Sequence, residues 1–307
     1  MKLANALKRC FKRSDSGFAT EKDVRSLLKA PKSGGVVIGG YDGKPIIYGG
    51  DDNVIVVAGG PRPMKGVGLV VRTLMTYRGS VVVHDFRGDL YRQTAKCREA
   101  MGQKVIRFAP GEVETVSSDF SVTDLQNGDT PVTLYLVSDS ANPKQASPVH
   151  RALLSAIIQT GLSAVIRYQD GHMITPYRHK LLLLLSEYAC FDGGVPGLSE
   201  GIPFMADYGI QSYITVRNTE QLEDLCTIVA NSHIRIFLPS PGINIKTAEY
   251  FSKMMGTVES SQGVHKPLMT ADDVRLLFRD HCLTLMPGHA PIFGALVPCW
   301  DPLWKRM

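Results

Sequence analysis

The chain has 307 residues, 44% of them hydrophobic, so it is long enough to bury a full core in one large domain or two smaller ones. Its 34 basic residues against 29 acidic residues give a net charge of +5, which permits nucleic acid as a partner without arguing for it. The six cysteines form no C-x-x-C pair and the eight histidines no paired-ligand spacing, which argues against a disulfide framework and against a metal centre.

The first residues are basic and polar, and we predict that residues 1–33 form an N-terminal extension. Leu3 and Leu7 fall on one helical face with basic residues elsewhere, a pattern that suits either contact with an anionic membrane surface or a solvated terminus. No apolar run reaches the roughly 18 residues of a membrane helix, so we expect no integral membrane segment. A glycine pair then marks the start of the compact domain, which we assign to residues 34–307.

From there the chain alternates short apolar runs with helical patterns. A hairpin comes first, because Asp42-Gly43 suits a tight turn between two apolar runs. Predicted strands cover residues 54–58, 80–85, 104–108, 131–137, 180–185, 210–216 and 233–238, and predicted helices lie near 66–77, 89–101, 147–167, 198–208, 218–228 and 245–255. We expect a loop at 257–267 and final strands at 282–286 and 291–297. This order predicts an α/β fold with a mostly parallel sheet and helices on both faces.

Three helix starts have a recognisable cause in the sequence. Ser147 stands before Pro148, which suits the first turn of a helix. Asn218 with Gln221 resembles a capping box. Thr270 with Asp273 is a looser version of the same pattern.

The stretch VIVVAGGPRPMKGVGLVV, residues 54–71, has the layout of a phosphate-binding P-loop. Gly59 and Lys65 stand at the spacing of G-x-x-x-x-G-K, between a buried strand and a helix. The residue before the lysine is Met64 instead of glycine, which costs about 1–2 kcal/mol if the loop needs a positive φ there. Two prolines in the turn lack N–H donors, and Gly66 has no hydroxyl for Mg²⁺. Lys65 is therefore either a phosphate ligand or a solvated lysine in a vestigial loop.

RHKLLLLLSEYA, residues 178–189, is an apolar strand that ends in a polar pair. It is built like a Walker B segment, although a buried central strand followed by a turn reads the same way. In a working site an aspartate of this pair holds Mg²⁺ and the following glutamate polarises the attacking water. Here the pair is Ser186 and Glu187, so the fixed negative charge for the metal is missing.

With the two motifs in this order, the chain resembles the ATPase domain of type IV secretion coupling proteins, the TraG-type conjugative DNA-transfer family. The matching segments include KGVGLVVRTLMTYRGSVVVHDFRGDLYRQTA, NGDTPVTLYLV, RHKLLLLLSEYA, FMADYGIQSYITV and NSHIRIF, and they run in family order from about residue 17 to the C-terminus. The resemblance implies a RecA-like P-loop NTPase fold. It further implies ATP and Mg²⁺ as cofactors, a hexameric ring at the inner membrane, and transfer of DNA or protein to a secretion channel.

The resemblance also assigns roles to single residues. It makes Glu187 the catalytic glutamate and Arg235 an arginine that could reach the phosphate of a neighbouring subunit. It places the following residues at the nucleotide: Gly59, Lys65, Gly66, Val67, Ser186 and Asp85.

The chain departs from the family where catalysis takes place. Met64 replaces glycine, Ser186 replaces aspartate, and Arg217 stands where the family presents a glutamine that senses the γ-phosphate. Relative to the family, we expect neither the N-terminal membrane helices nor the α-helical insert, since residues 111–116 lead almost directly into SSDFSVTDL.

Our hypothesis from the sequence is a shortened coupling-protein homologue with impaired or absent ATP hydrolysis, a pseudo-ATPase that docks to secretion or conjugation components. DNA and further copies of the chain are partners by resemblance, and the expected location is cytoplasmic or peripheral at the inner face of the bacterial inner membrane. The alternative is an active DNA-transfer ATPase with a compensated site, in which Glu187 and Asp85 take over the metal. A third interpretation is a degenerate gene product without a selected function.

Overall fold

The computed structural model describes residues 17–59, 65–110, 120–138, 143–223, 226–239, 244–259, 263–278, 280–296 and 298–299. The predictions for the basic N-terminus, for Pro61, Pro63 and Met64, and for the missing insert at 111–116 fall on residues outside these ranges.

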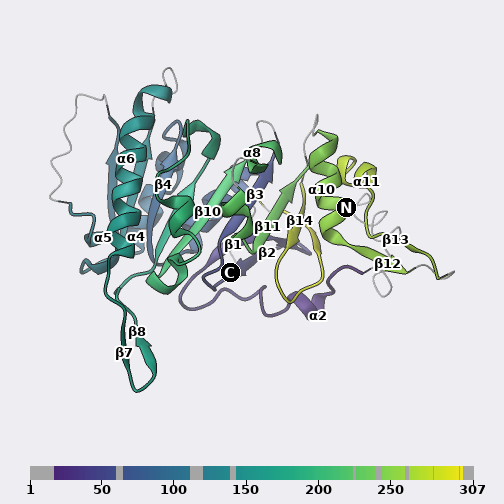
Figure 1. The fold of residues 1–307 in the computed structure, drawn as a ribbon, viewed down its shortest axis with the longest axis horizontal. Helices are drawn as coiled ribbons and strands as arrows, with labels where there is room; N and C mark the ends of the chain where they lie inside the picture. The colour runs from purple at the N-terminus through teal and green to yellow at the C-terminus, as the bar shows by residue number, and fades with distance from the viewer. Residues whose placement is uncertain are drawn as a thin grey trace.

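A nine-stranded sheet runs through the described part of the chain, in the order β15-β14-β11-β3-β10-β9-β4-β6-β5 (Figure 1). From β11 to β5 every neighbouring pair is parallel, and β14 and β15 add antiparallel strands at one edge. The predicted α/β class with a mostly parallel sheet is confirmed. The strands are β3 (Val54–Ala58), β4 (Ser80–Asp85), β5 (Lys104–Phe108), β6 (Val132–Val137), β9 (Leu181–Leu185), β10 (Ile210–Val216), β11 (Ile234–Leu238), β14 (His281–Leu285) and β15 (Ile292–Ala295).

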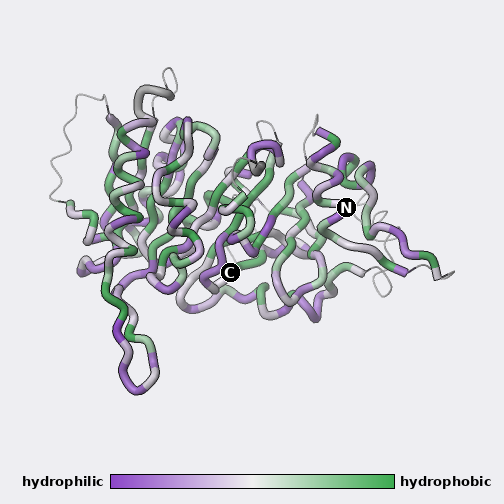
Figure 2. The backbone as a smooth tube through the Cα atoms, viewed as in Figure 1, coloured by the Kyte–Doolittle hydropathy of each residue, from purple (hydrophilic) through white to green (hydrophobic). Residues whose placement is uncertain are grey.

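The central strands are apolar throughout because both faces of the sheet are covered. In β9, Leu181, Leu183 and Leu185 pack into one hydrophobic core, and Leu182 and Leu184 into the other. Figure 2 shows hydrophobic segments following the strands of the sheet. Alternate residues of a strand point to opposite faces, so an unbroken apolar run is what a strand between two cores requires.

Helices cover both faces, as predicted. One face carries η1 (Lys65–Val70), α3 (Val71–Thr76), α4 (Asp89–Ala100) and the hairpin of β1 (Val36–Tyr41) and β2 (Lys44–Tyr48). The other face carries α6 (Pro143–Leu162), α7 (Leu198–Gly201), α9 (Cys226–Ala230), α10 (Ile245–Met255) and α11 (Ala271–Arg275). The remaining short helices are α2 (Glu21–Val24), α5 (Asp124–Asn127), α8 (Glu220–Glu223), η2 (Tyr188–Cys190) and η3 (Met205–Tyr208). Among the described helices, none combines the length and the apolar character needed to cross a bilayer.

Several predicted boundaries are wrong. Helix α6 begins at Pro143 and keeps Pro148 inside it, although the proline removes one backbone hydrogen bond. It ends at Leu162, and the predicted last turn is replaced by a hairpin of β7 (Arg167–Gln169) and β8 (His172–Ile174) that projects from the body (Figure 1). The expected loop at 257–267 contains a second small hairpin, β12 (Thr257–Glu259) with β13 (His265–Pro267). The predicted helices at 198–208 and 218–228 are each divided into shorter pieces.

Two predicted caps are present. The Asn218 side chain accepts a hydrogen bond from the Gln221 N–H at 3.1 Å. Thr270 and Asp273 exchange the reciprocal bonds of a capping box at the start of α11.

The described part of the N-terminal segment packs against the domain. Ala19 and Val24 are buried, and the Ala19 N–H donates to the Pro291 carbonyl at 3.0 Å. The Phe18 and Phe293 rings are 5.8 Å apart. Residues 17–33 therefore contribute to the hydrophobic core.

Candidate nucleotide site

The candidate site lies where neighbouring parallel strands end. β10 pairs with β3 on one side and with β9 on the other, so the residues that follow these three strands share one edge of the sheet. Gly59 follows β3, Ser186 and Glu187 follow β9, and Arg217 follows β10. The strand order thus brings the two sequence motifs to one edge, with β10 between them.

Lys65 is the first residue of η1, a short π-helical segment that continues into α3. Only 7% of the residue is exposed, which is unusual for lysine. Its ammonium makes an ion pair and a hydrogen bond with Oε1 of Glu187. The lysine of the loop motif is therefore not solvated but paired with the glutamate of the second motif.

Glu187 is held from three sides. Its backbone has a left-handed conformation, with φ 56° and ψ 54°, which costs a non-glycine residue roughly 1 kcal/mol. Its N–H donates to the Thr215 hydroxyl at 2.9 Å, and Oε2 accepts from Nε of Arg217 at 3.0 Å. Each carboxylate oxygen therefore has one cationic partner.

The charges at the site set the ionisation of the glutamate. Burial raises the pKa of the Glu187 carboxyl, but the Lys65 ammonium and the Arg217 guanidinium outweigh burial and hold the pKa below its ordinary value. The group is an anion at neutral pH and a weak base.

A buried histidine supports the loop that carries this glutamate. Nδ1 of His84 lies 2.6 Å from the Ser186 carbonyl, so Nδ1 carries the proton and donates it. Burial lowers the pKa of His84, which keeps the ring neutral. From the sequence, His84 is only a polar residue in an apolar strand, and this positioning contact with Ser186 is not predicted.

Asp85 binds the start of helix α4. The residue is buried, and its Oδ2 accepts from the Tyr91 N–H at 2.8 Å. Burial raises the pKa of this carboxyl. A carboxylate near a helix N-terminus stabilises the helix, so Asp85 has a structural role here, and its contact with a nucleotide stays a prediction.

The remaining predicted ligands stand along the loop and the strand ends. A Cβ built on Gly66 would meet nothing within 4 Å, so no neighbour requires a glycine at this position. Gly59, Val67 and Ser186 are all half-buried. Their contacts with a nucleotide also stay predictions.

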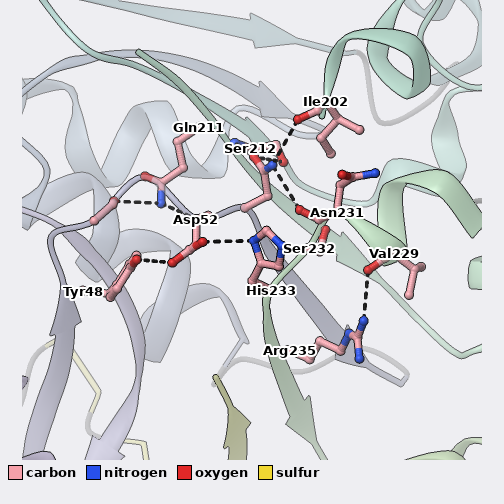
Figure 3. A network of polar contacts seen from close by, with 12 residues as sticks. Tyr48, Asp52, Ile202, Gln211, Ser212, Val229, Asn231, Ser232, His233 and Arg235 are labelled. Carbon is pink, nitrogen blue, oxygen red and sulfur yellow. Dashed lines mark hydrogen bonds and ion pairs between the residues drawn. The ribbon is translucent and has the colours of Figure 1, made fainter. Parts of the chain in front are cut away.

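Arg235 belongs to a different part of the chain. It pairs in register with Ile55, near the start of β3, and therefore lies toward the amino ends of the strands, away from Lys65. Its Nη2 donates to the Val229 carbonyl at 3.2 Å (Figure 3). Within one chain it does not join the site, and a role toward a neighbouring subunit stays a prediction.

The amino ends of the strands carry a polar network of their own (Figure 3). The Asp52 carboxylate accepts a hydrogen bond from the Tyr48 hydroxyl and lies 3.0 Å from Nδ1 of His233. The main-chain carbonyl of Asp52 accepts from Nε2 of Gln211 at 2.7 Å. Asn53 next to it is buried, and its Oδ1 accepts from both the N–H and the hydroxyl of Ser212 at 2.9 Å. These contacts join the end of β2 to the beginnings of β3, β10 and β11.

The family is decided by a match along most of the chain. The model of the family described as Type IV secretory system Conjugative DNA transfer matches residues 18–117 and 113–295. The chain belongs to this family. Its fold is the RecA-like P-loop NTPase fold, and the site described above stays the candidate nucleotide site of this domain.

Relatives of the conjugative DNA transfer family agree with this assignment. The conjugal transfer protein TraG of Escherichia coli is 29% identical over 147 residues, which cover 46% of this chain and 22% of TraG. VirD4 of Rhizobium radiobacter is 36% identical over 89 residues, which cover 29% of this chain and 13% of VirD4. The aligned part of the chain thus spans less than a quarter of the length of these relatives.

A solved structure shows the same fold. The plasmid coupling protein TrwB in complex with the ATP analogue ADPNP has a TM-score of 0.69 and 11% sequence identity, covering 93% of this chain and 95% of that chain. At 11% identity, this similarity shows a common fold and nothing more.

The described residues of the site do not fit Mg²⁺, the metal that the family resemblance implies. Mg²⁺ is usually bound through one or two carboxylates together with phosphate oxygens. In the described site, both oxygens of Glu187 have cationic partners, Asp85 is bound to Tyr91, and Ser186 provides no charge. The described residues also contain no group of three histidine, cysteine or acidic side chains that could hold a metal ion.

Proposed function

We propose that this chain acts in type IV secretion or conjugative DNA transfer as a coupling-protein homologue whose ATP hydrolysis is impaired or absent. Family membership supports the first part of the proposal. The partners would be components of the secretion or conjugation machinery and DNA, further copies of the chain in a ring, and the inner face of the bacterial inner membrane.

The observation that carries the second part is the double pairing of Glu187. A catalytic glutamate must orient and polarise the attacking water, which needs a carboxylate oxygen that is free to accept a proton. Here one oxygen is bound by Lys65 and the other by Arg217. The two cations also lower the pKa of Glu187, so its affinity for a proton is reduced.

The missing metal ligands support the same conclusion. Phosphoryl transfer depends mainly on positioning and on neutralisation of charge by the bound metal. Ser186 stands where a metal-binding aspartate is expected, and a serine supplies no carboxylate. Hydrolysis therefore lacks both a free catalytic carboxylate and a held metal.

An active, compensated ATPase is the alternative, favoured by the fact that Lys65 and Glu187 are both retained and in contact. In that case a nucleotide would displace Glu187 from both Lys65 and Arg217 and release the carboxylate for catalysis. ATP turnover of the purified protein, measured in Mg²⁺ with and without DNA, separates the two.

We expect turnover no higher than that of the Lys65→Ala variant under both conditions. Turnover on the order of 1 per second that is lost in Lys65→Ala would defeat the proposal, since that is the range of working enzymes. Thermal unfolding of both proteins checks that the variant remains folded.

A further inference from the structure

Two positive side chains and one negative side chain meet at the carboxyl edge of the sheet. Lys65 is buried, with 9% of its side chain exposed, whereas 60% of the Arg217 side chain is exposed. Glu187 lies between them with 20% of its side chain exposed. The group as a whole has a surplus of one positive charge, and its exposed member is the arginine.

Arg217 is fixed at its base and open at its end. Its main-chain N–H donates to Oε1 of Gln221 at 2.7 Å, and Nε of its guanidinium donates to Oε2 of Glu187. Among the described residues, no hydrogen bond involves its two terminal nitrogens, so four N–H groups of the guanidinium remain available. A guanidinium held on one edge and open on the other suits the bidentate binding of phosphate oxygens.

We propose that Arg217 takes the charge-neutralising place of the metal, so that the site binds the polyphosphate of a nucleoside triphosphate without a divalent cation. The inference rests on the proposed function, because it concerns the same site. In this arrangement Lys65 exchanges Glu187 for a phosphate oxygen. Arg217 keeps Glu187 neutralised and donates to the phosphates through its terminal nitrogens.

The same geometry makes Mg²⁺ unfavourable. A metal-bound nucleotide would bring a doubly charged cation close to the Arg217 guanidinium, and the resulting repulsion grows as water is excluded from the site. Glu187, the carboxylate next to this guanidinium, stays paired with Arg217 and does not offset the repulsion. The site should therefore prefer the metal-free anion.

Calorimetric titration of the full chain with ATP, in EDTA and in Mg²⁺, tests the inference. We expect binding in EDTA at least as tight as binding in Mg²⁺. Arg217→Met, which has no donor, should weaken the EDTA affinity roughly tenfold, the loss of about one charge-assisted hydrogen bond. Inorganic triphosphate in EDTA should bind and lose affinity in the same variant, which distinguishes recognition of the phosphates from recognition of the base.

Arg178→Met is the matched control. The Arg178 side chain is 64% exposed and makes an ion pair with Asp129 at 3.2 Å, but it stands before β9, at the opposite edge of the sheet. Binding only in Mg²⁺, no binding in either solution, or equal losses in the two variants would overturn the inference. None of those results contradicts the proposed lack of hydrolysis. Mg²⁺-dependent turnover contradicts the proposed function, whatever the result of the titration in EDTA.

Discussion

The two edges of the central sheet are both polar, but their polar groups make different kinds of contact. At the amino ends of the strands, the buried Asn53 and Gln211 bind main-chain groups through neutral amides, while the contacts of Asp51 with Lys180 and of Asp52 with His233 lie on the exposed surface. At the carboxyl ends, Lys65, Glu187 and Arg217 bind one another as charges. Neutral side chains bound to the backbone fix strands in place, whereas charges paired with each other can exchange partners when an anion arrives. The amino edge therefore stabilises the sheet, whereas the carboxyl edge is suited to binding an anion.

The strongest test of this contrast is Asn53→Ala. It removes the acceptor of two Ser212 hydrogen bonds and a donor to the Asn231 carbonyl at 3.2 Å, all close to the core. We expect a loss of about 2–4 kcal/mol in the free energy of unfolding, measured with urea, because buried groups are left unpaired.

Asn231→Ala is its control, since Asn231 is half-buried and, among the described residues, its side chain donates to the Thr227 carbonyl of its own helix turn at 2.9 Å. A change within about 0.5 kcal/mol is expected there. If both variants lost the same stability, the amino edge would not have the structural role assigned to it.

A smaller effect is expected from Glu187→Gln at the other edge. The substitution leaves Lys65 buried without a carboxylate, which should destabilise the fold by about 1–3 kcal/mol. Asp89→Asn is the comparison, because Asp89 makes ion pairs with Arg87 at 2.9 Å and Arg92 at 2.5 Å on the surface, where such pairs contribute about 0–1 kcal/mol. Equal losses in urea unfolding would mean that the Lys65 pair is no more than a surface contact.

Glu187 also gives the stability a pH dependence. Its pKa in the folded protein is lower than its ordinary value of 4.5, so the folded state favours the ionised form. The stabilisation is complete above the unfolded pKa and is lost as the pH falls through the folded pKa. The stability difference between the wild type and Glu187→Gln should therefore shrink below pH 4.5, and a constant difference down to pH 3 would contradict the pairing.

The smallest effect concerns the loop itself. Gly66→Ala places a methyl group where nothing lies within 4 Å, in a helical segment, and should stabilise the protein by about 0.5–1 kcal/mol. Gly79→Ala is the opposite case, because the added Cβ would lie 2.5 Å from the Lys180 carbonyl oxygen. This substitution should destabilise the protein. A loss of stability in Gly66→Ala by thermal unfolding would show that the glycine is required by the folded loop.

The sequence predicts the sheet well where a strand is buried on both faces. The leucine run of β9 can be recognised because both cores require apolar residues there. The β7–β8 hairpin escapes prediction because its strand residues are all exposed, so no alternation distinguishes it from the end of a helix. Its Asp170-Gly171 turn, with both residues at positive φ, is the signal that could have located it.

At the site, motif spacing finds Lys65 and Glu187 but not what surrounds them. The contacts of Thr215 and Arg217 with Glu187 arise because β10 lies beside β9, an order that no local pattern encodes. The left-handed backbone of Glu187 is equally hidden, because glutamate is not a residue that signals positive φ. Tertiary neighbours, rather than propensity, decide both features.

The end of β10 binds both the main chain and the side chain of Glu187. Thr215 accepts from its main-chain N–H, and Arg217, two residues further on, donates to its carboxylate. One strand end therefore determines both the location of the glutamate and the direction of its side chain. A displacement of β10 along β9 would disturb both contacts at once, so the orientation of Glu187 is a direct measure of the alignment of these two strands.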